Sequence, residues 1–114
     1  MLIIIPTLVF LGTAYAGYVL ANEIKQKKGV LAPVHAMHRY SALAGIAILA
    51  VIISFSEVTR LTITAFVTLL AAGLGGFFLF RLIYKNQPPP MLMVYGHAGT
   101  AITGILILVA AFFI

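Results

Sequence analysis

The chain has 114 residues, of which 63% are hydrophobic and 8% are charged. A water-soluble domain of this length could not bury that much apolar surface, so the composition excludes a soluble globular fold. The formal net charge is +5, but the basic residues lie at particular connections between apolar runs, which argues against nucleic-acid binding. The absence of cysteine excludes disulfides, iron–sulfur clusters and covalently attached c-type haem.

Four apolar runs are long enough to cross a hydrocarbon core, which takes about 20 residues per helix. They are Leu2–Ala21, a second run that begins near Val34 and has no formal charge from Tyr40 to Ser56, Leu61–Phe80 and Met91–Ile114. Backbone groups in lipid must be hydrogen-bonded within the segment, so each run is predicted to be a helix. We expect an all-α, four-helix transmembrane bundle that forms a single domain over residues 1–114.

The first run contains Ala14-Tyr15-Ala16, which resembles the small-x-small cleavage site of a signal peptide. No positive charge precedes the run, as a secretory signal would require, so we interpret it as the first helix. A connection at Asn22–Ala32 follows, and Pro33 is placed to begin the second helix. Ser54–Arg60 is predicted to be a tight turn, and Asn86–Pro90 a stiff connector.

The basic residues are distributed unevenly among these connections. Only Arg60 lies at the second connection, whereas the first and third hold Lys25, Lys27, Lys28, Arg39, Arg81 and Lys85. Cytoplasmic loops of membrane proteins are enriched in lysine and arginine. We therefore expect the first and third connections to face the cytoplasm and both termini to lie on the non-cytoplasmic side. The basic side chains are also expected to contact the lipid bilayer.

The two halves of the chain are similar at an offset of 59 residues. His38–Leu49 aligns with His97–Leu108, and six of the twelve positions are identical. Self-similarity at a fixed offset indicates a repeat, so we interpret the chain as a tandem duplication of a two-helix unit, at about 1–59 and 60–114. Each unit would enter and leave the membrane on the same side. The two repeats are therefore expected to be parallel, related by a pseudo-twofold axis along the membrane normal.

One helix face that begins at each histidine has the same pattern of small residues. Positions i, i+3, i+4 and i+7 share a face of a helix. These positions hold His38, Ser41, Ala42 and Gly45 on the second helix and His97, Thr100, Ala101 and Gly104 on the fourth. The repeat predicts that both histidines lie at equal depth, about one turn inside the basic side. If the second and fourth helices face each other, both imidazoles point into one space.

Two interpretations of this face are open. In the first, the small residues let the second and fourth helices pack closely, and each histidine hydrogen-bonds a backbone group or hydroxyl. In the second, a flat cofactor lies against the small residues, and His38 and His97 both ligate its metal. Histidines within membrane spans are often functional, and the matched pair favours the second interpretation. Gly17 and Gly76, at a similar depth on the first and third helices, would then give room to the edge of the macrocycle.

With this histidine pair on facing helices, the chain resembles the small four-helix membrane cytochromes of the b type. The resemblance covers the architecture together with His38 and His97. It implies one haem b clamped between the two imidazoles, and electron transfer with quinone or a partner redox protein, as an oxidoreductase component. The haem propionates would point toward the basic side, where Arg39, Arg81, Lys85 or Lys28 would pair with them.

The main alternative is a structural or chlorophyll-binding small subunit of a larger membrane energy-converting complex. Such a chain would be surrounded by partner membrane proteins or further copies, which suits the near absence of loops. Small multidrug exporters have a similar length but depend on an acidic residue in the first span, whereas Glu23 and Glu57 lie at helix ends. A hydrolytic enzyme is disfavoured, because no nucleophile–base pair lies inside the bundle. His35 is either an exposed interfacial histidine or a proton carrier beside a quinone headgroup.

Overall fold

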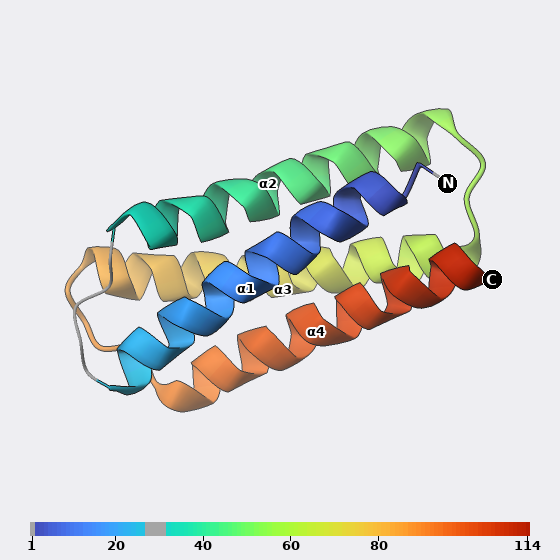
Figure 1. The fold of residues 1–114 in the computed structure, drawn as a ribbon. Coiled ribbons are helices and arrows are strands. Elements are labelled where there is room, and N and C mark those ends of the chain that lie inside the picture. The colour runs from blue at the N-terminus through green and yellow to red at the C-terminus, as the bar shows by residue number, and fades with distance from the viewer. Residues whose placement is uncertain (1, 27–31) are drawn as a thin grey trace.

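The computed structural model describes residues 2–26 and 32–114, which form a bundle of four long helices (Figure 1). The helices are α1 (Ile4–Lys25), α2 (Ala32–Phe55), α3 (Arg60–Tyr84) and α4 (Met91–Phe113). α1 and α3 run in one direction, and α2 and α4 run in the other (Figure 1). The all-α four-helix bundle expected from the four apolar runs is confirmed.

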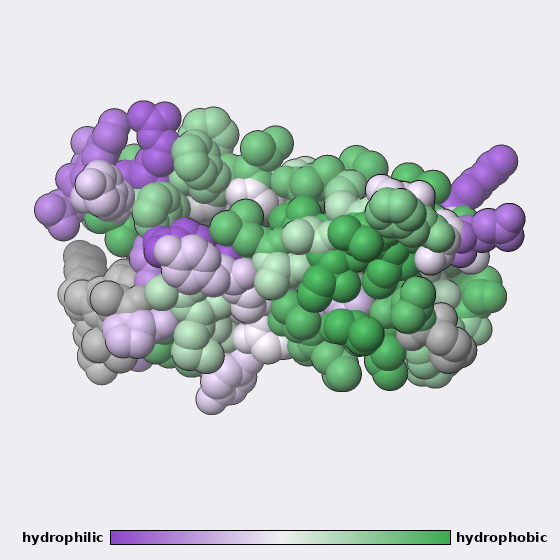
Figure 2. All heavy atoms as spheres, turned by 90° about the horizontal axis from the view of Figure 1, so that it is seen from above, coloured by the Kyte–Doolittle hydropathy of each residue, from purple (hydrophilic) through white to green (hydrophobic). Residues whose placement is uncertain are grey.

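Each helix is long and apolar enough to cross a membrane. The outer surface agrees with this, because large apolar side chains such as Leu8, Leu43 and Leu106 are about 60% exposed. Seen from one side, the middle of the bundle is mostly apolar and the hydrophilic atoms gather toward its ends (Figure 2). The chain is therefore an integral membrane protein with four spans.

The two ends of the bundle differ in charge. The chain termini and the α2–α3 connection lie together at one end, which we call the terminal end (Figure 1). The end of α1, the start of α2 and the α3–α4 connection lie at the other end, which we call the basic end. Lys25, Arg39 and Arg81 belong to helix turns near the basic end and Lys85 caps α3 there, whereas Arg60 begins α3 at the terminal end. Lys27 and Lys28, which the sequence also places at the first connection, lie outside the described residues.

Local capping explains where α3 begins and ends. The Thr59 hydroxyl accepts a hydrogen bond from the backbone N–H of Thr62, at 3.3 Å, as an N-cap does. At the other end Asn86 has a φ of 58°. The N–H groups of Asn86 and Gln87 donate to the carbonyls of Ile83 and Leu82. This is a Schellman motif, which satisfies the last carbonyls of α3 and turns the chain toward α4.

The helices pack as two hairpins. α1 packs along α2 and α3 along α4, with narrower contacts between α1 and α4 and between α2 and α3. Across the described residues, the backbones of α2 and α4 do not approach each other, so these helices lie diagonally opposite. The close packing of the second helix on the fourth, which was one interpretation of the small residues, therefore does not occur.

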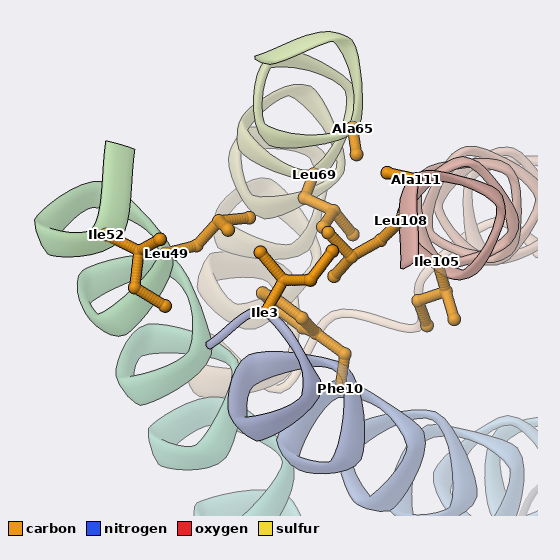
Figure 3. Packing of buried hydrophobic residues seen from close by; sticks show 9 residues of the cluster. All are labelled: Ile3, Phe10, Leu49, Ile52, Ala65, Leu69, Ile105, Leu108 and Ala111. Carbon is orange, nitrogen blue, oxygen red and sulfur yellow. The ribbon is translucent and has the colours of Figure 1, made fainter. Parts of the chain in front are cut away.

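A cluster of buried hydrophobic residues occupies the terminal half of the bundle. Figure 3 shows nine of its buried side chains, which come from all four helices and from the residue before α1: Ile3, Phe10, Leu49, Ile52, Ala65, Leu69, Ile105, Leu108 and Ala111. All nine lie on the terminal side of His38 and His97 along their helices. Leu20, Leu79 and Val94 are also buried, on the basic side of the histidines. The two histidines therefore lie between this cluster and a smaller set of buried apolar side chains.

Leu108 is fully buried in this core, and its replacement by alanine should leave a cavity. We expect Leu108→Ala to lower the free energy of unfolding by about 2 kcal/mol, at the low end for buried leucines because lipid also solvates the separated helices. The matched control is Leu106→Ala, on a side chain that is 62% exposed, with an expected change within about 0.5 kcal/mol. Unfolding by sodium dodecyl sulfate in mixed micelles measures both, and equal losses would contradict the assigned core.

Candidate functional site

The structure brings the two predicted ligands together at the centre of the bundle. His38 and His97 are each the seventh residue of a helix that starts at the basic end, so each lies about 9 Å from its helix start. Their ring centroids are 6.1 Å apart, and the ring planes are nearly perpendicular, at 89°. Two diagonally opposite helices therefore place their imidazoles side by side across the bundle axis.

Both imidazoles make the same backbone hydrogen bond. Nδ1 of His38 lies 2.8 Å from the carbonyl oxygen of Thr13 in α1, and Nδ1 of His97 lies 2.8 Å from that of Ala72 in α3. A carbonyl oxygen only accepts, so Nδ1 carries the proton in both rings. In the neutral imidazole the lone pair then lies on Nε2. Histidines that ligate a metal through Nε2 are held in this way by a backbone or carboxylate acceptor on Nδ1.

Gly17 and Gly76 are what allow the imidazoles to reach these carbonyls. A Cβ atom on Gly17 would lie 2.8 Å from Cε1 of His38, and one on Gly76 would lie 2.9 Å from Cε1 of His97. Each glycine is four residues after the accepting carbonyl, so a side chain there would stand beside the carbonyl oxygen. The space at these glycines, predicted from the sequence to hold the edge of a macrocycle, is filled by the imidazoles themselves.

Gly45 and Gly104 also admit a neighbouring side chain. A Cβ atom on Gly45 would lie 2.8 Å from the ring of Phe10 in α1, and one on Gly104 would lie 2.8 Å from the side chain of Leu69 in α3. These two glycines therefore serve the packing of each hairpin. The other small residues of the predicted face are partly buried and belong to the helix turn that follows each histidine: Ser41, Ala42, Thr100 and Ala101.

The hydroxyl groups near the two imidazoles differ. Beside His38, the hydroxyls of Thr13 and Ser41 are hydrogen-bonded to each other at 2.6 Å. At the equivalent position near His97, Ala72 has no hydroxyl, and the hydroxyl of Thr100 donates to the carbonyl of Gly96 in its own helix. The backbone acceptors are thus matched, whereas the hydroxyl pair is present on one side of the bundle.

The hydroxyl pair gives a testable coupling between α1 and α2. We expect Thr13→Val and Ser41→Ala to show a coupling energy of about 0.6 kcal/mol in a double-mutant cycle of unfolding in mixed micelles, the average for such bonds in membrane helices. Thr13→Val keeps the carbonyl that accepts from His38 Nδ1, so the imidazole should not move. The control pair is Thr13→Val with Thr100→Val, and a coupling of the same size there would contradict the assignment.

Arg39 and His35 lie against aromatic rings. The guanidinium carbon of Arg39 is 4.8 Å from the ring centroid of Tyr40 and 4.5 Å from that of Phe80, a cation–π arrangement. The ring of His35 is 5.4 Å from the same Phe80 ring. Within the described residues no three His, Asp, Glu or Cys side chains group as metal ligands, so His35 does not add a third ligand to the pair.

Thr13 and Ala72 were not identified from the sequence. They act through backbone oxygens, which any residue provides, so their side chains carry no signal. The available signal is the glycine four residues later in each helix, aligned at the same offset as the histidines. Comparison with family models, curated proteins and solved structures finds no match to this chain.

Proposed function

We propose that this chain is a membrane electron-transfer protein that holds one b-type haem through His38 and His97. The observation that carries the proposal is the imidazole pair, with ring centroids 6.1 Å apart and both Nδ1 atoms held by carbonyls. Two imidazoles that hold one metal through Nε2, at about 2.0 Å each, would have ring centroids about 6 Å apart. The spacing and the protonation pattern therefore fit two imidazoles that would hold one haem iron.

The number of protein ligands also favours a macrocycle. A zinc site takes three or four protein ligands, and the described residues do not group three. Two imidazoles are enough for an iron that already has four porphyrin nitrogens. A chlorophyll takes a single imidazole, so the alternative role as a chlorophyll-binding subunit does not account for the pair.

The residues of the chain determine the environment of this site. The backbone acceptors on Nδ1 orient both rings and raise the basicity of Nε2. The buried apolar cluster excludes water on the terminal side, and the small residues Ala42 and Ala101 lie one helical turn after the two histidines. Bound haem would supply a one-electron couple.

The position of the pair determines which face serves a partner. It lies nearer the basic end, so a quinone or a partner redox protein would approach there, with Arg39, Arg81 and Lys85 placed to attract acidic groups. By the distribution of basic residues, this end faces the cytoplasm and the termini face the other side. One centre at this depth cannot cross a core of about 30 Å, so transfer across the membrane would need a second centre from a partner or another copy.

An internal duplication accounts for the matched contacts. The hydrogen bonds of His38 with Thr13 and of His97 with Ala72 both span 25 residues, and the glycines under the two rings have the same offset as the histidines. Duplication of a two-helix unit, with parallel copies, would make such a symmetric ligand pair from one ancestral histidine.

The function is tested with the haem-loaded protein in lipid nanodiscs under anaerobic conditions. We expect a reversible one-electron redox titration, and reduction of the haem when a quinol is added. The matched control is the His35→Ala variant, which should titrate in the same way if His35 is not a ligand. A bound haem that exchanges electrons with neither a quinol nor soluble mediators would overturn the electron-transfer role.

A further inference from the structure

A groove at the basic end is independent of the histidine site. It lies where the last turns of α3 approach the first turn of α4, and its volume is about 320 Å³. It is lined by Phe78, Arg81, Leu82, Lys85, Gln87 and Met93. Neither His38 nor His97 lines it, although Arg81 and Lys85 are among the cations proposed above to attract acidic groups of a partner.

The groove combines an apolar surface with two cations. Phe78 and Leu82 are one helical turn apart, and so are Arg81 and Lys85, so the two pairs form adjacent rows on α3. Its lining includes the amide of Gln87 and no acid. Glu57 precedes α3 at the terminal end, whereas Glu23 lies in the last turn of α1, at the same end as the groove but outside its lining. The groove lining therefore places two basic side chains beside an apolar surface.

The backbone at this end fixes the groove. The Schellman motif at Asn86 positions Lys85 and Gln87. α4 begins at Met91, so the partial positive charge of its first turn adds to that of the side chains. Within residues 2–26 and 32–114, the structure gives neither Arg81 nor Lys85 an ion pair, whereas Arg39 lies against the rings of Tyr40 and Phe80.

We propose that this groove binds the headgroup of an anionic phospholipid. The phosphate would lie against Arg81 and Lys85, and an acyl chain would run along Phe78, Leu82 and Met93. Basic pockets between membrane helices bind anionic headgroups in this way, and long basic side chains reach the headgroup level from within the apolar region. A zwitterionic lipid has the phosphate but also a cation, which the two basic side chains would repel.

The test is native mass spectrometry of the purified protein titrated with phosphatidylglycerol or phosphatidylcholine. We expect one phosphatidylglycerol to bind more tightly than phosphatidylcholine. The Arg81→Gln/Lys85→Gln double variant should bind it about 30-fold more weakly, about fivefold for each charge removed. Lys25→Gln is the matched control, because Lys25 is an exposed cation in the last turn of α1 at the same end, and its affinity should be unchanged.

Four results would overturn the proposal: equal affinity for both lipids, full binding by the double variant, an equal loss in Lys25→Gln, or displacement of the lipid by free glycerol phosphate. An equal loss in Lys25→Gln would indicate diffuse electrostatic attraction. Displacement of the lipid by free glycerol phosphate would assign the groove to a soluble phosphate. If circular dichroism indicates that the double variant is not helical, the single variants Arg81→Gln and Lys85→Gln decide the question, each with an expected fivefold loss.

Discussion

Replacement of either His38 or His97 by alanine should abolish the six-coordinate b-type absorption spectrum of the haem-loaded protein. In the proposed site each imidazole would hold the iron independently, so the loss of one would leave the iron short of a protein ligand. We expect haem affinity to fall by more than about 100-fold, beyond the 10–100-fold cost of losing a group that only orients a ligand. Titration of the apoprotein with haem, followed by absorption, measures the affinity.

The matched control for the two ligand variants is His35→Ala. His35 lies one helical turn before His38 and contacts Phe80, so it shares the helix and the residue type without the proposed role. Its variant should keep the spectrum and the affinity. If His38→Ala and His97→Ala bind haem as the unmodified protein does, or if only one of them matters, the shared ligand pair is contradicted.

The second large effect is expected at the glycines beneath the imidazoles. Gly17→Ala would place a Cβ atom 2.8 Å from Cε1 of His38, and Gly76→Ala would place one 2.9 Å from Cε1 of His97. The ring must then move away from its carbonyl acceptor and lose the Nδ1 hydrogen bond. We expect haem affinity to fall by about 10–100-fold in each variant, and the free energy of unfolding to fall by about 1–3 kcal/mol.

Gly12→Ala is the control for the glycine variants. Gly12 is on the same helix as Gly17, and a Cβ atom there would meet no neighbouring atom within 4 Å. Its replacement should leave haem affinity unchanged and the unfolding free energy the same or slightly higher. Haem titration and unfolding in mixed micelles measure both properties. A loss in Gly12→Ala as large as that in Gly17→Ala would mean that the ring contact is not the cause.

The fold was predictable because composition and length leave few options to a chain in lipid. Four apolar runs of about 20 residues must be helices. Pro33 marks the start of α2 and Asn86 marks the end of α3, each to within a residue or two. The repeat offset also predicted that His38 and His97 lie level. The structure adds that α2 and α4 lie diagonally opposite each other in the bundle. This arrangement depends on how all four helices pack together, and the sequence of a single segment does not determine it.

The finer details of the site were less predictable. The four residues of each small-residue face share a helix side, but Gly45 and Gly104 receive core side chains while Gly17 and Gly76 receive imidazoles. Which neighbour fills a glycine depends on how the partner helix is rotated, and the helix period does not define that. The propionate-binding role predicted for Arg39 remains a prediction, and its position against Tyr40 and Phe80 depends on packing between α2 and α3.

The most direct test of the central claim is the absorption spectrum of the unmodified protein, purified mildly from membranes supplied with haem, oxidised and then reduced. Haem content per chain is measured on the same sample. We predict one haem b per chain, six-coordinate in both states, as two imidazole ligands require. A chlorophyll spectrum, or a colourless protein that takes up no added haem, would contradict the account.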